Sequence, residues 1–198
     1  MTAANDAAGH WDPLTVTLKL AKAVQGGRRD QQMVDALRRV DRVLGEIACP
    51  KHPPATSEQA EAMENVGAAW GNLGNAWSDM GMREEALGAA QQACAWLRFA
   101  MPLGNQAREW FPATLTNLGR DLSALGRREE ALQATQEAVG LYRELHRTRP
   151  EAFAPRLATS LNNLGAMLSR LGRRERAVQG KQVALGGHRK IQQTSPEA

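Results

Sequence analysis

The stretch WGNLGNAWSDMGMREEAL, residues 70–87, occurs in related form twice more along the chain. The second copy is LTNLGRDLSALGRREEAL at residues 115–132, and the third is LNNLGAMLSRLGRRERAV at residues 161–178. The copies are offset by 45 and 46 residues. Self-similarity at a fixed period of this size is typical of stacked structural repeats. The sequence therefore predicts a repeat array, an architecture that usually offers an extended binding surface rather than a catalytic centre.

Each copy carries two glycines seven residues apart, namely Gly74 and Gly81, Gly119 and Gly126, and Gly165 and Gly172. The first glycine of each pair falls in mid-helix, where Gly costs about 1 kcal/mol relative to Ala. Its recurrence predicts that a second helix approaches closely, and the matching places on that helix are Ala86, Ala131 and Ala177. The second glycine falls at a helix end, where a left-handed backbone conformation terminates the helix.

Periodicity and punctuation predict the organisation of the rest of the chain. We expect a flexible tail at 1–12, a divergent helical pair at 13–48, a proline-rich linker at 49–55, three repeats within 56–193 (about 56–101, 106–148 and 155–190) and a polar tail at 194–198. The expected helices are Pro13–Gln25, one capped by Asp30, one capped by Thr56 and running to Met80, Arg83–Ala100, Trp110–Leu125, Arg128–Arg147, Pro155–Leu171 and Arg173–Leu185.

The second of these helices carries an apolar stripe that must be covered, formed by Met33, Leu37, Val40, Leu44 and Ile47. The cover could be the helix at 57–80 of the same chain or the same element of a second chain. We favour the same chain, because the linker at 49–55 is too short to separate the two elements widely. This predicts a monomer, or a weak dimer formed through the N-terminal end.

Composition supports an all-α protein. Aromatic residues make up only 5% of the chain and apolar residues 42%. The two cysteines lie in unrelated surroundings, so a disulfide framework is not expected. No secretory signal or run of about 18–20 apolar residues is present, and the expected location is the cytoplasm.

Charge is distributed unevenly, with a net −2 over residues 1–102 and +6 over residues 103–198. Such asymmetry can indicate nucleic-acid binding. The basic residues are, however, interleaved with Glu and lack the aromatic neighbours on which bases stack. Solvated faces of Arg-rich helices are the better interpretation, and a nucleic-acid partner is not expected.

The repeat unit resembles the tetratricopeptide repeat family. Trp70, Leu73, Gly74 and Trp77, followed by Ala86 on the next helix, are close to that family's signature. The long period is similar to the branch that includes kinesin light chains and many bacterial repeat proteins. The resemblance implies a right-handed α-solenoid of antiparallel helix pairs, and members of the family mostly bind peptides or proteins.

In such arrays the first helices of successive units line the concave side. The resemblance therefore implies a binding groove formed by Asn72, Asn75, Asp79, Asn117, Arg120, Asn162, Asn163 and Arg170. A ladder of Asn side chains can bond the backbone of an extended peptide, since a carboxamide both donates and accepts. The alternative is that these Asn side chains bond adjacent helices. The lysines of the family's carboxylate clamp for chaperone tails are replaced by Gly71, Thr116 and Ala166, so that ligand is not expected.

Signals for chemistry are weak. Cys49 and His52 could both ligate a metal, but no second Cys/His pair follows at useful spacing. No nucleophile elbow, metalloprotease, phosphate-loop or dinucleotide-binding pattern is present. We therefore expect no enzymatic activity, no cofactor and no metal.

The leading functional hypothesis is a scaffold or adaptor that holds an extended peptide or a partner helix in its groove. A second hypothesis is a regulatory sensor that binds a small peptide or metabolite and modulates a partner. A third is a basic nucleic-acid accessory protein.

Overall fold

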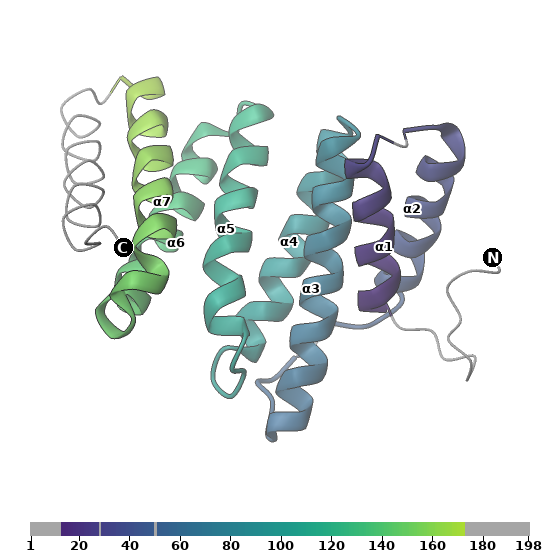
Figure 1. The fold of residues 1–198 in the computed structure, drawn as a ribbon, viewed down its shortest axis with the longest axis horizontal. Coiled ribbons are helices and arrows are strands. Elements are labelled where there is room, and N and C mark those ends of the chain that lie inside the picture. The colour runs from purple at the N-terminus through teal and green to yellow at the C-terminus, as the bar shows by residue number, and fades with distance from the viewer. Residues whose placement is uncertain (1–12, 28, 50, 173–198) are drawn as a thin grey trace, which may run out of the picture. The chain divides into compact units, whose positions relative to one another are not determined.

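A computed structural model describes residues 13–27, 29–49 and 51–172 of the chain, and these residues form helices without any strand. The helices are α1 (Pro13–Gln25), α2 (Gln31–Gly45), α3 (Ser57–Asp79), α4 (Arg83–Ala100), α5 (Ala107–Ala124), α6 (Arg128–Thr148) and α7 (Pro150–Arg170), drawn in Figure 1. The all-α class is confirmed. The expected tails and the helix predicted at 173–185 lie outside the described residues.

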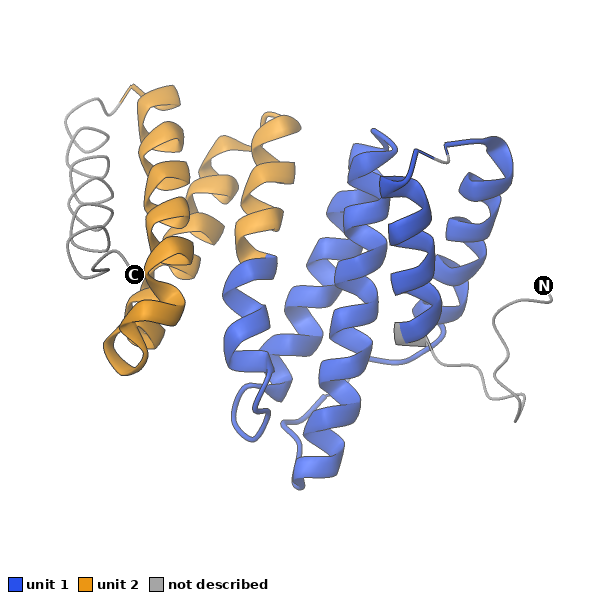
Figure 2. Cartoon of the chain, viewed as in Figure 1, with its two compact units in different colours: residues 1–114 blue, residues 115–198 orange. Residues whose placement is uncertain are grey.

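The chain divides into two compact units, residues 1–114 and residues 115–198, shown in blue and orange in Figure 2. The division falls inside α5. The predicted partition into a divergent pair, a linker and three repeats stays a prediction, although residues 51–55 contain no helix, as their prolines require.

The glycines at the helix ends behave as predicted. Gly81, Gly126 and Gly172 have φ of 79°, 79° and 76°. After α3 the N–H of Met82 donates to the carbonyl of Trp77 at 2.9 Å. After α5 the N–H of Arg127 donates to the carbonyl of Leu122, also at 2.9 Å. These six-to-one bonds satisfy carbonyls that a helix end would otherwise leave unpaired.

Both predicted N-caps are present. Asp30 accepts a bond from the N–H of Met33 at 2.8 Å, and Thr56 accepts one from the N–H of Gln59 at 3.2 Å. The return bond of a capping box would run from the Gln59 side chain to the N–H of Thr56. Here the Gln59 side chain accepts from the N–H of Ala55 instead, at 2.9 Å.

Two predicted helix starts are wrong. α5 begins at Ala107 rather than Trp110, and α7 begins at Pro150 rather than Pro155. Of the loop expected at 149–155, only Arg149 is therefore outside a helix. The earlier start of α7 brings Phe153 into a buried position, 1% exposed, with two guanidinium groups near its ring. Those of Arg149 and Arg156 lie 4.8 and 5.6 Å from its ring centroid. Burial of this ring outweighs the one backbone hydrogen bond that Pro155 removes inside the helix.

In the first unit, α3 is packed against α1, α2 and α4. The α2 stripe is covered within the same chain, but by α1 as well as by the predicted α3. Met33, Leu37, Val40 and Leu44 share one buried cluster with Val16, Ala21 and Val24 of α1, and with Leu73 and the rings of Trp70 and Trp77 of α3. These two tryptophans are therefore core residues rather than a ligand cage, in agreement with the sequence interpretation.

The mid-helix glycines permit the close approach that their recurrence predicted. A Cβ on Gly74 would lie 3.4 Å from the carbonyl oxygen of Ala86 in α4. A Cβ on Gly119 would lie 2.5 Å from the hydroxyl of Thr135 and 3.3 Å from the carbonyl oxygen of Ala131, both in α6. The helix predicted to face Gly165 lies outside the described residues.

Gly119→Leu should lower the free energy of unfolding by about 1–3 kcal/mol, the usual cost of overpacking a tight contact. The matched control is Gly140→Leu in α6, because Gly140 has open space where a Cβ would stand. The control should not lose stability, since Leu favours helix over Gly. Urea denaturation followed by circular dichroism measures both variants. Equal losses would show that the contact at Gly119 is not what keeps α5 and α6 close.

The N-terminus of α5 is capped by a buried side chain from α3. Glu64, only 4% exposed, accepts hydrogen bonds from the backbone N–H groups of Gln106 and Ala107 at 2.7 and 2.6 Å. A Cβ on Gly104 would overlap the Glu64 carboxylate, so the loop before α5 needs a glycine there. The carboxylate also complements the positive end of the α5 dipole.

Glu64→Ala should lower the free energy of unfolding by about 1–3 kcal/mol, because it leaves the buried N–H of Ala107 and the part-buried N–H of Gln106 without their acceptor. Glu61→Ala serves as the control, since Glu61 is exposed one turn earlier on α3. A surface change of that kind is expected to stay within about 0.5 kcal/mol. Thermal or urea unfolding measures the difference, and indistinguishable curves would contradict the capping role.

Candidate functional site

A concave cavity of about 340 Å³ lies within the second unit, between α5 and α7. It is lined by Thr116, Asn117, Arg120 and Ser123 of α5 and by Thr159, Asn163, Ala166, Met167 and Arg170 of α7. We call this cavity the α5/α7 groove. Its volume is within the range of ordinary ligand sites, about 300–1,000 Å³.

Helical spacing places these side chains on one face of each helix. The lining residues of α5 follow one another at intervals of one, three and three residues, and those of α7 repeat at similar intervals. Other faces of the same helices bury Leu115 and Leu122 in α5, and Leu161 and Leu168 in α7. Each helix therefore contributes an apolar face to the core and a polar face to the groove.

The floor of the groove is held by α6, which lies behind it. The hydroxyl of Thr135 donates to the carbonyl of Ala131 at 2.8 Å and makes a contact of 3.0 Å with the Met167 sulfur. Thr135 is fully buried and Met167 is 8% exposed. Through these contacts Thr135 of α6 fixes the side chain of Met167, which lines the groove.

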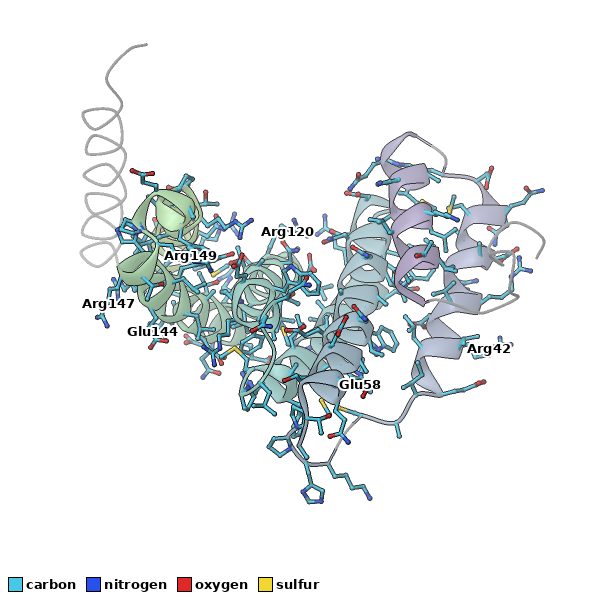
Figure 3. The ribbon with its side chains drawn as sticks, turned by 60° about the horizontal axis from the view of Figure 1, so that its bottom comes forward. Arg42, Glu58, Arg120, Glu144, Arg147 and Arg149 are labelled. Carbon is cyan, nitrogen blue, oxygen red and sulfur yellow. The ribbon has the colours of Figure 1, made fainter. Side chains whose placement is uncertain are left out.

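Two guanidinium groups stand at the groove. The Nε of Arg120 donates to the Asp121 carboxylate at 3.3 Å, and the Arg120 side chain is 56% exposed while that of Asp121 is 8% exposed. Arg170 of α7 reaches across to α5, where its Nη1 donates to the Ser123 hydroxyl at 2.8 Å. Figure 3 shows Arg120 on one side of this unit and Glu144 and Arg147 of α6 on the other.

The structure brings together four of the eight residues predicted for the groove: Asn117, Arg120, Asn163 and Arg170. Asn162 is exposed on α7 but does not line the cavity. Asn72, Asn75 and Asp79 lie on α3, in the first unit, and are not part of this cavity. Their role in binding stays a prediction.

Sequence reasoning did not identify Ser123 and Met167 as lining residues. A signal for Ser123 was available, because serine recurs in all three copies as Ser78, Ser123 and Ser169. No comparable signal existed for Met167, whose equivalents are Ala76 and Asp121. Its place in the groove depends on the contact with Thr135.

Within the residues that the structure describes, no group of three or more His, Cys, Asp or Glu side chains is arranged to hold a metal ion. In the same part of the chain, no helix combines the length and apolarity needed to cross a bilayer.

The family model described as tetratricopeptide repeat matches residues 113–147 and 157–179 of the chain. Every residue that lines the α5/α7 groove falls within these two segments. The resemblance derived from the repeat signature is thereby confirmed at the level of the family. The kinesin-light-chain-like branch stays a prediction.

Among solved structures, BtubC (BKLC) from P. vanneervenii is similar at 18% identity with a TM-score of 0.67, over 96% of this chain and 69% of that one. MamA is similar at 17% identity with a TM-score of 0.47, over 89% of each chain. A putative kinesin light chain of Podosopora anserina with nearly identical TPR-like repeats has 20% identity and a TM-score of 0.41, over 94% of this chain and 99% of that one. The first likeness supports the helical-repeat fold. No curated protein sequence matches the chain.

Proposed function

We propose, from the premise that residues 113–147 and 157–179 are tetratricopeptide repeats, that this protein is a non-catalytic scaffold or adaptor. Such repeats support a role in protein–protein interaction in general. The finer part of the proposal is that the α5/α7 groove holds an extended peptide or a partner helix. The observation that carries it is the convergence of Asn117 and Asn163, from two copies of the repeat, on one cavity.

The chemistry of the lining suits a polypeptide backbone. Asn117 and Asn163 each offer a carboxamide that donates and accepts, which matches the paired N–H and C=O groups of an extended chain. Hydroxyls of Thr116, Ser123 and Thr159 lie at the same surface. The Thr159 hydroxyl already donates to the Pro155 carbonyl at 3.0 Å, so its oxygen can serve a ligand as an acceptor. An extended peptide advances about 3.3 Å per residue, so the groove has room for only a short segment.

The two other functional hypotheses have less support. The nine lining residues, all in the described part of the chain, include no aromatic side chain on which a base could stack. A regulatory sensor would use the same groove for a small peptide or metabolite, and a stimulus-dependent change in a partner's activity would distinguish it from a scaffold. Coverage of the α2 stripe by α1 and α3 of the same chain supports a monomer or weak dimer, which stays part of this proposal.

The combined change Asn117→Ala and Asn163→Ala should weaken peptide binding, because each lost hydrogen bond contributes about 0.5–1.5 kcal/mol. The probe is a peptide selected on the unmodified protein from a displayed random library, and fluorescence anisotropy measures its affinity.

Asn162→Ala is the matched control, since Asn162 adjoins Asn163 in sequence but does not line the cavity. The control should bind the probe like the unmodified protein, and circular dichroism should show equal helicity in all variants. A correctly folded double variant with unchanged affinity would place the binding surface elsewhere.

A further inference from the structure

We infer that the α5/α7 groove selects an extended peptide carrying an Asp or Glu side chain, whose carboxylate is bound by Arg170 with Arg120 beside it. The inference rests on the proposed function and adds the chemical class of its ligand. It is based on the positive charges of Arg120 and Arg170 at the groove and on the partners that these two side chains have among the described residues.

Arg170 has a neutral partner. Its Nη1 donates to the Ser123 hydroxyl at 2.8 Å, and among the described residues its guanidinium forms no ion pair. A guanidinium presents five N–H donors in a planar fork, and a hydroxyl engages only one of them. The remaining fork matches a carboxylate, which accepts two parallel bonds from arginine.

The bond to Ser123 also fixes where this charge stands. Ser123 follows Arg120 by three residues on α5, so the two lie on the same face, one helical turn apart. The Arg170 guanidinium, which comes from α7, is therefore held over α5 within one turn of Arg120. Two cations from two copies of the repeat meet at one end of the groove.

Asp121 does not cancel this charge. Its carboxylate is 8% exposed and bonds the Nε of Arg120 from the interior side, while the Arg120 side chain remains 56% exposed. The three groups together carry a net charge of +1 toward the groove. An incoming carboxylate would meet guanidinium nitrogens rather than the buried Asp121 oxygens.

The other lining groups favour a peptide over a nucleic acid as the source of the anion. Asn117 and Asn163 are suited to a peptide backbone, and the lining offers no aromatic ring for stacking a base. A single net positive charge would also bind a polyphosphate backbone only weakly, because proteins that bind such backbones neutralise many phosphates. The carboxylate of an acidic side chain within an extended segment fits both the charge and the carboxamides.

The test is selection of a random peptide library, displayed so that the peptides have no free C-terminus, on the full-length protein and its variants. Binders to the unmodified protein should be enriched in Asp and Glu. Arg170→Ala should abolish that enrichment, and Arg170→Glu should shift selection toward Lys and Arg.

Arg147→Glu is the matched control, because Arg147 is an exposed arginine of α6 on the other side of the same unit (Figure 3). Arg147→Glu changes the net charge by the same amount as Arg170→Glu. It should leave the enrichment of Asp and Glu among the selected peptides intact. Changing the acidic residue of one selected peptide to its amide should weaken binding about tenfold or more, the effect of losing a charge-assisted bond. The difference should shrink as ionic strength rises.

The outcomes separate this inference from the proposed function. Peptides captured without acidic enrichment, or with enrichment that persists in Arg170→Ala, would overturn the inference and leave the groove as a peptide site. Failure to capture any peptide would overturn both. Displacement of selected peptides by a single-stranded oligonucleotide at comparable concentration would also overturn the choice of a peptide carboxylate.

Discussion

Contact between paired helices at mid-helix glycines is the constraint on which the fold depends. At Gly119 the space of a Cβ is already occupied by the Thr135 hydroxyl and the Ala131 carbonyl, and Gly74 is nearly as close to the backbone of α4. Such glycines cost about 1 kcal/mol of helix propensity each. The cost is offset because close approach turns one face of each first helix toward its partner and leaves another face available to solvent.

That division of faces makes a binding surface possible. α5 buries Leu115 and Leu122 while presenting Asn117 and Arg120, and α7 does the same with Leu161 and Leu168 against Asn163 and Arg170. Because the buried face holds each helix against the core, the backbone positions from which the polar side chains project are fixed. The Thr135 hydroxyl, which holds both α6 and Met167, links the core directly to the floor of the groove.

Electrostatics then distinguishes this groove from a generic polar surface. Arg120 is paired with the buried carboxylate of Asp121, whereas Arg170 donates to the Ser123 hydroxyl and forms no ion pair among the described residues. The protein thereby holds two guanidinium groups at defined positions before any ligand arrives. If the groove binds a peptide as proposed, such preorganisation would lower the entropic cost of binding and favour a ligand of negative charge.

The sequence by itself determined the repeat period, the all-α class, both N-caps and the left-handed glycines at 81, 126 and 172, since each depends on residues close together in the chain. The family resemblance of the repeat implied Asn117, Arg120, Asn163 and Arg170 as groove residues; these four line the α5/α7 groove, and their role in binding stays a proposal. Only the tertiary structure decided that Glu64 caps α5 from 43 residues away and that Arg170 reaches Ser123 across 47 residues. It also placed the start of α7 at Pro150, where burial of Phe153 outweighs the proline signal at 155. These features depend on which side chains come into contact once the helices pack. The periodicity of the sequence does not specify those contacts.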